Sequence, residues 1–148
     1  MSSKRQSSAH DSSVGRHVRF HTPAQSFGGT LNTGAISQAM AERLPISATV
    51  QRWGEEIYFD VPVKMKNTQP TRNVKIGDIG YWPDGPSLCI FFGKTPASKG
   101  HEPRAGSDVT IVGHTDAGPA LLRSIAEGTT ITLTRASPSS TEILRNIH

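Results

Sequence analysis

Three aromatic segments punctuated by glycine dominate the middle of this 148-residue chain. They are residues 53–59 (WGEEIYF), 77–83 (GDIGYWP) and 88–96 (LCIFFGKTP), and seven of the nine aromatic residues lie between Trp53 and Phe92. Glycine allows positive φ and proline cannot donate a ladder hydrogen bond, so apolar residues beside them indicate β-strands that meet tight corners. The middle of the chain is therefore expected to form a bent sheet that contains the core.

Length and composition predict one domain between the two polar ends, because a chain of this size can bury a core without a second domain. The single cysteine, Cys89, cannot form an internal disulfide, and its apolar neighbours predict a buried, unreactive thiol. The sequence shows neither a signal peptide nor a run of ~20 apolar residues. We therefore expect a soluble, cytoplasmic protein without a membrane partner.

The two ends of the chain are polar. Residues 1–16 combine basic side chains with six serines among the first thirteen positions, a composition that predicts disorder. A short basic tail of this kind is typical of a solvated extension, so nucleic acid is not the expected partner, although an adaptor role through this tail stays open. Residues 136–148 are expected to form a second tail.

The remaining pattern predicts many strands and two helices. Asn32 or Thr33 is the expected N-cap of the first helix, which ends at Pro45, and the second begins near Asp116 and ends at Gly128. The expected strands include residues 18–21, 48–53, 57–63, 74–76, 81–82, 88–92, 108–113 and 130–134. The longest irregular stretch in the domain is expected at residues 94–106, and long ordered loops often carry function.

Common catalytic motifs are absent from the sequence. It contains no phosphate-binding loop, nucleophile elbow or paired-cysteine zinc spacing. Glu55 and Glu56 would point to opposite faces of a regular strand, so they are not expected to act as a carboxylate pair. His101 and His114 lie near acidic residues without the spacing of metal ligands, and neither a metal nor another cofactor is predicted.

The three aromatic segments, in this order, resemble the small cyclophilin-like proteins of archaea and bacteria, a family of largely unknown function. The resemblance covers roughly residues 17–135. It implies a mainly β fold, a closed eight-stranded β-barrel with a helix packed over each end, related to the peptidyl-prolyl isomerases. The fold alone does not imply the activity, because function belongs to sites.

The resemblance also implies a candidate site. Cyclophilins bind a proline side chain in a hydrophobic pocket and twist its amide with the help of an arginine. Phe92 matches the phenylalanine that lines the pocket, and Arg52 lies near the expected position of the catalytic arginine, within a segment that differs from the family's motif. His101 falls in the loop that corresponds to another wall of the pocket.

Two main functions follow. The first is a peptide- or small-ligand-binding protein whose groove is lined by Trp53, Tyr58, Tyr81, Trp82 and Phe92. The alternative is a weak peptidyl-prolyl cis-trans isomerase that uses Arg52 and Phe92 and requires both side chains on one face. The expected partner in either case is a proline-containing peptide or a small ligand, and other roles of the fold stay open. The oligomeric state is not predicted.

Overall fold

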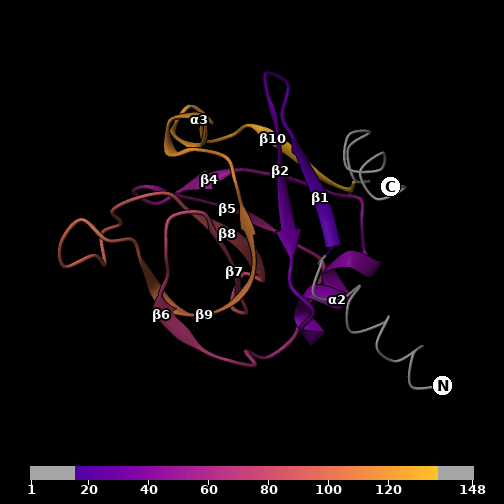
Figure 1. The fold of residues 1–148 in the computed structure, drawn as a ribbon, viewed down its shortest axis with the longest axis horizontal. Coiled ribbons are helices and arrows are strands. Elements are labelled where there is room, and N and C mark those ends of the chain that lie inside the picture. The colour runs from indigo at the N-terminus through magenta and orange to yellow at the C-terminus, as the bar shows by residue number, and fades with distance from the viewer. Residues whose placement is uncertain (1–15, 137–148) are drawn as a thin grey trace, which may run out of the picture.

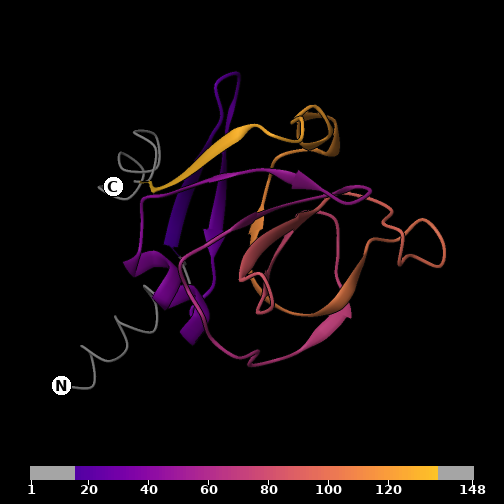
Figure 2. The same ribbon diagram turned by 180° about the vertical axis from the view of Figure 1, so that it is seen from behind.

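The computed structural model describes residues 16–136, and their strands form one twisted, strongly curved antiparallel sheet (Figures 1 and 2). The strands are β1 (Arg16–His21), β2 (Ser26–Leu31), β3 (Ile46–Thr49), β4 (Gln51–Arg52), β5 (Glu56–Asp60), β6 (Thr71–Asn73), β7 (Asp78–Trp82), β8 (Ser87–Phe91), β9 (Arg104–Thr115) and β10 (Thr130–Arg135). The predicted disorder of residues 1–16 concerns residues outside the described part, except Arg16, which begins β1. The predicted C-terminal tail also lies outside it, apart from its first residue.

The sheet is not the closed eight-stranded barrel that the sequence predicted. It has ten strands in the order β3-β10-β1-β2-β9-β7-β8-β5-β4, with β6 paired to β9 off this path. The two ends of the path, β3 and β4, follow each other in the chain and are separated only by Val50. Val50 donates its backbone N–H to the carbonyl of Thr129, while β4 turns away to pair with β5. Within residues 16–136, the ends of the sheet are therefore joined by the chain and not by a ladder of hydrogen bonds.

The two predicted helices are present at different lengths. They are α2 (Ala35–Glu42) and α3 (Pro119–Arg123), and Figures 1 and 2 show them far apart in the molecule. The N-cap of α2 is Gly34 and not Asn32 or Thr33. Asn32 still shapes this end, because its side-chain oxygen accepts hydrogen bonds from the Gly34 N–H and the Ser37 hydroxyl. Neither helix in the described part has the length and apolar content that a transmembrane helix needs.

The central strands are covered on both faces. Along β5, Ile57 and Phe59 enter the main core, while Glu56 and Tyr58 point to the opposite side of the sheet. The same alternation in β8 places Leu88 and Ile90 in the main core. Cys89 and Phe91 join a second, smaller cluster, completed by Val74, Ala105 and Val109. This second cluster positions the candidate site.

The covering segment, β6 with the first half of β9, differs from the prediction. The expected strand at residues 74–76 lies instead at Thr71–Asn73, and β9 begins at Arg104, inside the expected loop. Residues 74–77 form a turn, because the Asp78 carboxylate accepts the Lys75 N–H and Gly77 has a φ of 95°. The early start of β9 brings residues 104–109 over the second cluster.

Candidate functional site

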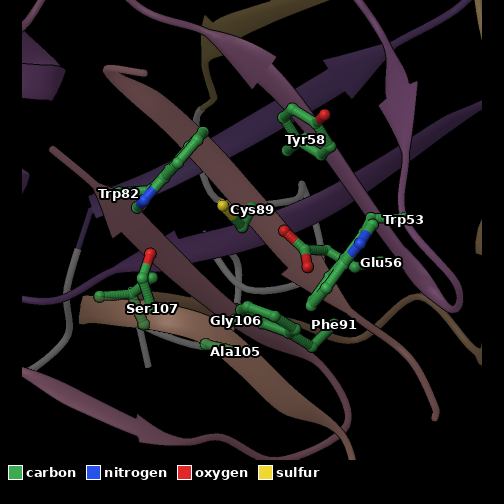
Figure 3. A pocket seen from close by; sticks show the side chains of 10 residues that line it. Trp53, Glu56, Tyr58, Trp82, Cys89, Phe91, Ala105, Gly106 and Ser107 are labelled. Atoms are coloured by element: carbon green, nitrogen blue, oxygen red, sulfur yellow. The ribbon is translucent and has the colours of Figure 1, made fainter. Parts of the chain in front are cut away.

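A cavity of about 250 Å³ lies on the second cluster's side of the sheet (Figure 3). Its walls come from four strands and one turn that are distant in the sequence. Glu56 and Tyr58 come from β5, Trp82 from β7, Cys89 and Phe91 from β8, Ala105, Gly106, Ser107 and Val109 from β9, and Trp53 from the turn between β4 and β5. The cavity therefore exists only in the folded chain.

Glycines let the aromatic side chains approach the backbone. The turn before β5 closes through a hydrogen bond from the Trp53 N–H to the Glu56 carbonyl, with Gly54 at a φ of 63°. The indole of Trp53 then packs over Gly106, where an added Cβ would stand 2.8 Å from the ring. Across the cavity, the rings of Tyr58 and Trp82 meet edge to face with centroids 6.2 Å apart. Figure 3 shows the two indoles on opposite sides, with Glu56 and Cys89 between them.

Glu56 is the acidic residue of the cavity. Its relative exposure is 6%, and burial raises its pKa from 4.5 to about 7, although a hydrogen bond with the Cys89 thiol partly opposes that rise. Among the described residues that line the cavity, no Arg, Lys or His balances this carboxylate. Glu56 is thus poised between its neutral and charged forms near neutral pH.

The two other ionisable groups of the cavity stay neutral. Burial, with a smaller contribution from the Glu56 charge, raises the pKa of the Tyr58 hydroxyl. Burial and then Glu56 also raise the pKa of the Cys89 thiol well above its ordinary value. A thiol in this state is a poor nucleophile, because the reactive form is the thiolate. The predicted burial of Cys89 is confirmed.

Trp82 lines the cavity and carries a buried donor. Its Nε1 is buried and has no hydrogen-bond partner within residues 16–136, and burying such a group without a partner costs free energy. Figure 3 shows the indole as one wall of the cavity, with the Ser107 hydroxyl directed toward it. The N–H is enclosed by the protein, so the indole contributes its ring to the wall of the cavity.

The structure brings together three of the predicted binding residues, Trp53, Tyr58 and Trp82. Tyr81 lies elsewhere: it is fully buried in the main core, where its hydroxyl donates to the Val63 carbonyl at 2.6 Å and accepts the Met65 N–H at 2.9 Å. Its role in the structure is to anchor the segment after β5.

The other predicted residues also lie outside the cavity. The guanidinium of Arg52 sits 5.5 Å from the ring centroid of Phe92, so these two side chains do share a face. Phe92, however, is only 1% exposed and belongs to the main core. Arg52 Nη1 donates to the carbonyls of Arg123 at 2.8 Å and Ile125 at 3.1 Å. His101 is exposed on the loop before β9 and does not line the cavity.

The sequence reasoning missed Glu56, Cys89, Phe91 and the β9 residues as parts of one site. Strand alternation could have found the first three. Glu56 shares a face of β5 with Tyr58, and in β8 Phe91 pairs with Glu56 and Cys89 pairs with Tyr58. The contribution of β9 had no local signal, because residues 104–106 were expected in a loop. Within residues 16–136, His, Cys, Asp and Glu side chains do not gather in threes as ligands of a metal ion would.

Comparison with known proteins places this geometry in a family. The family model described as cyclophilin-like matches residues 16–134. The chain belongs to the cyclophilin-like family. Its fold is similar to the solution structure of a hypothetical protein from Archaeoglobus fulgidus, with a TM-score of 0.71 and 32% sequence identity over 83% of this chain and 96% of that one. No curated protein matches the chain. Membership in the cyclophilin-like family thus establishes the relationship and the fold, and the function has to be argued from the cavity.

Proposed function

We propose that this cyclophilin-like protein binds a small ligand in the cavity around Glu56. The observation that carries the proposal is a buried carboxyl group that lies within aromatic walls and has no basic neighbour among the described residues that line the cavity. Apolar pockets with a few convergent polar groups and a perturbed pKa are typical of binding sites. We place this function in the cytoplasm, where a chain with one buried thiol needs no disulfide.

The volume of the cavity favours a small molecule over a peptide. At about 250 Å³, it lies below the usual range of roughly 300–1,000 Å³ for ligand pockets. A peptide could insert only one side chain, whereas a compact molecule could bury most of its surface. The site is therefore proposed to select a ligand with few atoms.

The alternative, peptidyl-prolyl isomerisation, has one observation in its favour, the proximity of Arg52 to Phe92. An isomerase also needs an open pocket at the phenylalanine and a free donor on the arginine. Phe92 is buried in the main core, and Arg52 donates to two backbone carbonyls next to α3. The cavity around Glu56 meets the requirements of a binding site more fully.

A cavity-filling variant tests the proposal. Wild type, Ser107→Leu and the surface control Ala120→Leu would be screened by thermal unfolding against small amines, alcohols, amides and carboxylic acids, because a bound ligand raises the unfolding temperature. We expect hits with wild type and with Ala120→Leu that Ser107→Leu loses, since leucine at position 107 would occupy the cavity. Hits that persist in Ser107→Leu would contradict the proposed site, as would the absence of hits at millimolar concentration.

A further inference from the structure

We propose that the ligand of this cavity is a small organic cation, an alkylated ammonium that also carries a hydrogen-bond acceptor. This inference rests on the proposed function and adds the chemical class of the ligand. Three properties of the cavity carry it: its charge, its aromatic walls and the hydroxyl of Ser107. Each property requires something different from the ligand.

The charge of the cavity favours a cation. Glu56 is the single acidic group that lines the cavity in the described part of the chain, and no basic side chain there compensates it. An ionised carboxylate removed from water is costly unless it is paired. A cationic ligand would supply the missing charge, whereas an anionic ligand would add a second negative charge without a counter-ion. The cavity therefore discriminates against anions.

The aromatic walls of the cavity also favour a cation. Four aromatic side chains, from Trp53, Tyr58, Trp82 and Phe91, surround the carboxyl group. Figure 3 shows the two indoles edge-on at opposite sides, so that their faces border the space between them. The negative face of an aromatic ring attracts a cation, and groups of such rings bind alkylated ammonium ions. A metal ion fits less well, because one carboxylate and one neutral thiol provide too few ligands.

Ser107 adds a polar contact to the cavity. It lines the cavity, so a ligand that brings an acceptor oxygen can accept a hydrogen bond from its hydroxyl. Figure 3 shows this hydroxyl directed toward the Trp82 side of the cavity. A bare alkylammonium makes no such bond, whereas an alcohol or carbonyl group on the ligand does.

Choline and 3,3-dimethylbutan-1-ol make a matched pair of probes, since they share shape and hydroxyl group and differ in charge. Calorimetric titration of the wild-type protein at pH 8 should show choline binding at least about tenfold more tightly than the alcohol, the preference that a cation gains from a carboxylate and aromatic faces. Equal affinities, or preference for the alcohol, would overturn the cation assignment. Such a result would leave the proposed small-ligand site standing if Ser107→Leu abolished the binding of the alcohol.

Two substitutions locate the source of the preference. Glu56→Gln should weaken choline binding by about tenfold and leave the alcohol unchanged, whereas Glu55→Gln, at the neighbouring position outside the cavity, should alter neither. Trp53→Leu keeps an apolar wall and removes a π face, so it should reduce the preference for choline over the alcohol. Full choline affinity in Glu56→Gln would contradict the proposal. Circular dichroism and thermal unfolding would confirm that each variant is folded before titration.

Discussion

The buried Glu56 should make the stability of the protein fall with rising pH, and Glu56→Gln should remove that part of the dependence. In the unfolded chain the carboxyl loses its proton near its ordinary pKa of 4.5, whereas in the folded protein burial holds the pKa at about 7. Between these values the folded state binds the extra proton, so the free energy of unfolding decreases as pH rises. The stabilising effect of protonation is fully present below pH 4.5 and is lost above about pH 7.

The size of this change in the free energy of unfolding follows from the pKa values of Glu56 in the folded and unfolded states. Each pH unit between them costs about 1.4 kcal/mol, so ionisation of Glu56 lowers the free energy of unfolding by about 3 kcal/mol. Glutamine has the shape of the protonated acid and does not ionise. The stability of Glu56→Gln relative to wild type should therefore rise by about 3 kcal/mol between pH 4.5 and pH 8.

Urea unfolding of wild type and Glu56→Gln at pH 4.5, 6, 7 and 8 would measure this difference. Glu55→Gln is the matched control, because the Arg123 guanidinium holds the pKa of Glu55 below its ordinary value. Its effect has the opposite sign: the control should lose stability at neutral pH, and that loss should shrink as pH falls through the pKa of Glu55. A constant difference between Glu56→Gln and wild type across this range would contradict a raised pKa of Glu56, since the carboxyl would then titrate alike in the folded and unfolded states.

Two further predictions concern residues around the cavity. Arg52→Ala should lower the free energy of unfolding, measured by urea unfolding, by about 1–3 kcal/mol, because it removes hydrogen bonds to two carbonyls and a contact with Phe92. The choline affinity of this variant should stay the same, and its loss would place the site at Arg52 instead. Cys89 should react with a thiol reagent at least about a hundredfold more slowly in the native protein than in the urea-unfolded protein, since it is buried and its pKa is raised. Equal reaction rates in an absorbance assay would contradict its burial.

The sequence predicted the kind of fold well, because its signals are local. Alternation along residues 57–59 and the turn residues around Gly54 mark strands and corners wherever the rest of the chain lies. The closed barrel was wrong in detail, since closure depends on how β3 and β4 pair with strands that are far away in the sequence. The position of β6 was predicted wrongly for the same reason, because it is set by pairing with β9.

The candidate site was predictable in part for a related reason. Alternation separates Phe91 from Phe92 and Glu55 from Glu56, yet it does not say which face of the sheet becomes the main core. The resemblance drew attention to Phe92, whereas the cavity formed on the side of Phe91. Only the position of β9 over the second cluster shows which face of the sheet carries the cavity.

An NMR titration that follows the indole N–H signals tests the proposed cation site most directly. The sequence contains two tryptophans, Trp53 and Trp82, so the ¹⁵N-labelled protein gives two such signals, and Trp53→Phe identifies the one from Trp82. Small ammonium compounds and their uncharged isosteres would be added one at a time. We expect an ammonium compound to shift the Trp82 indole signal and the amides of Glu56, Cys89 and Ser107. Shifts confined to the surroundings of Arg52 and Phe92, or a Trp82 signal unmoved by every compound, would contradict the proposed site.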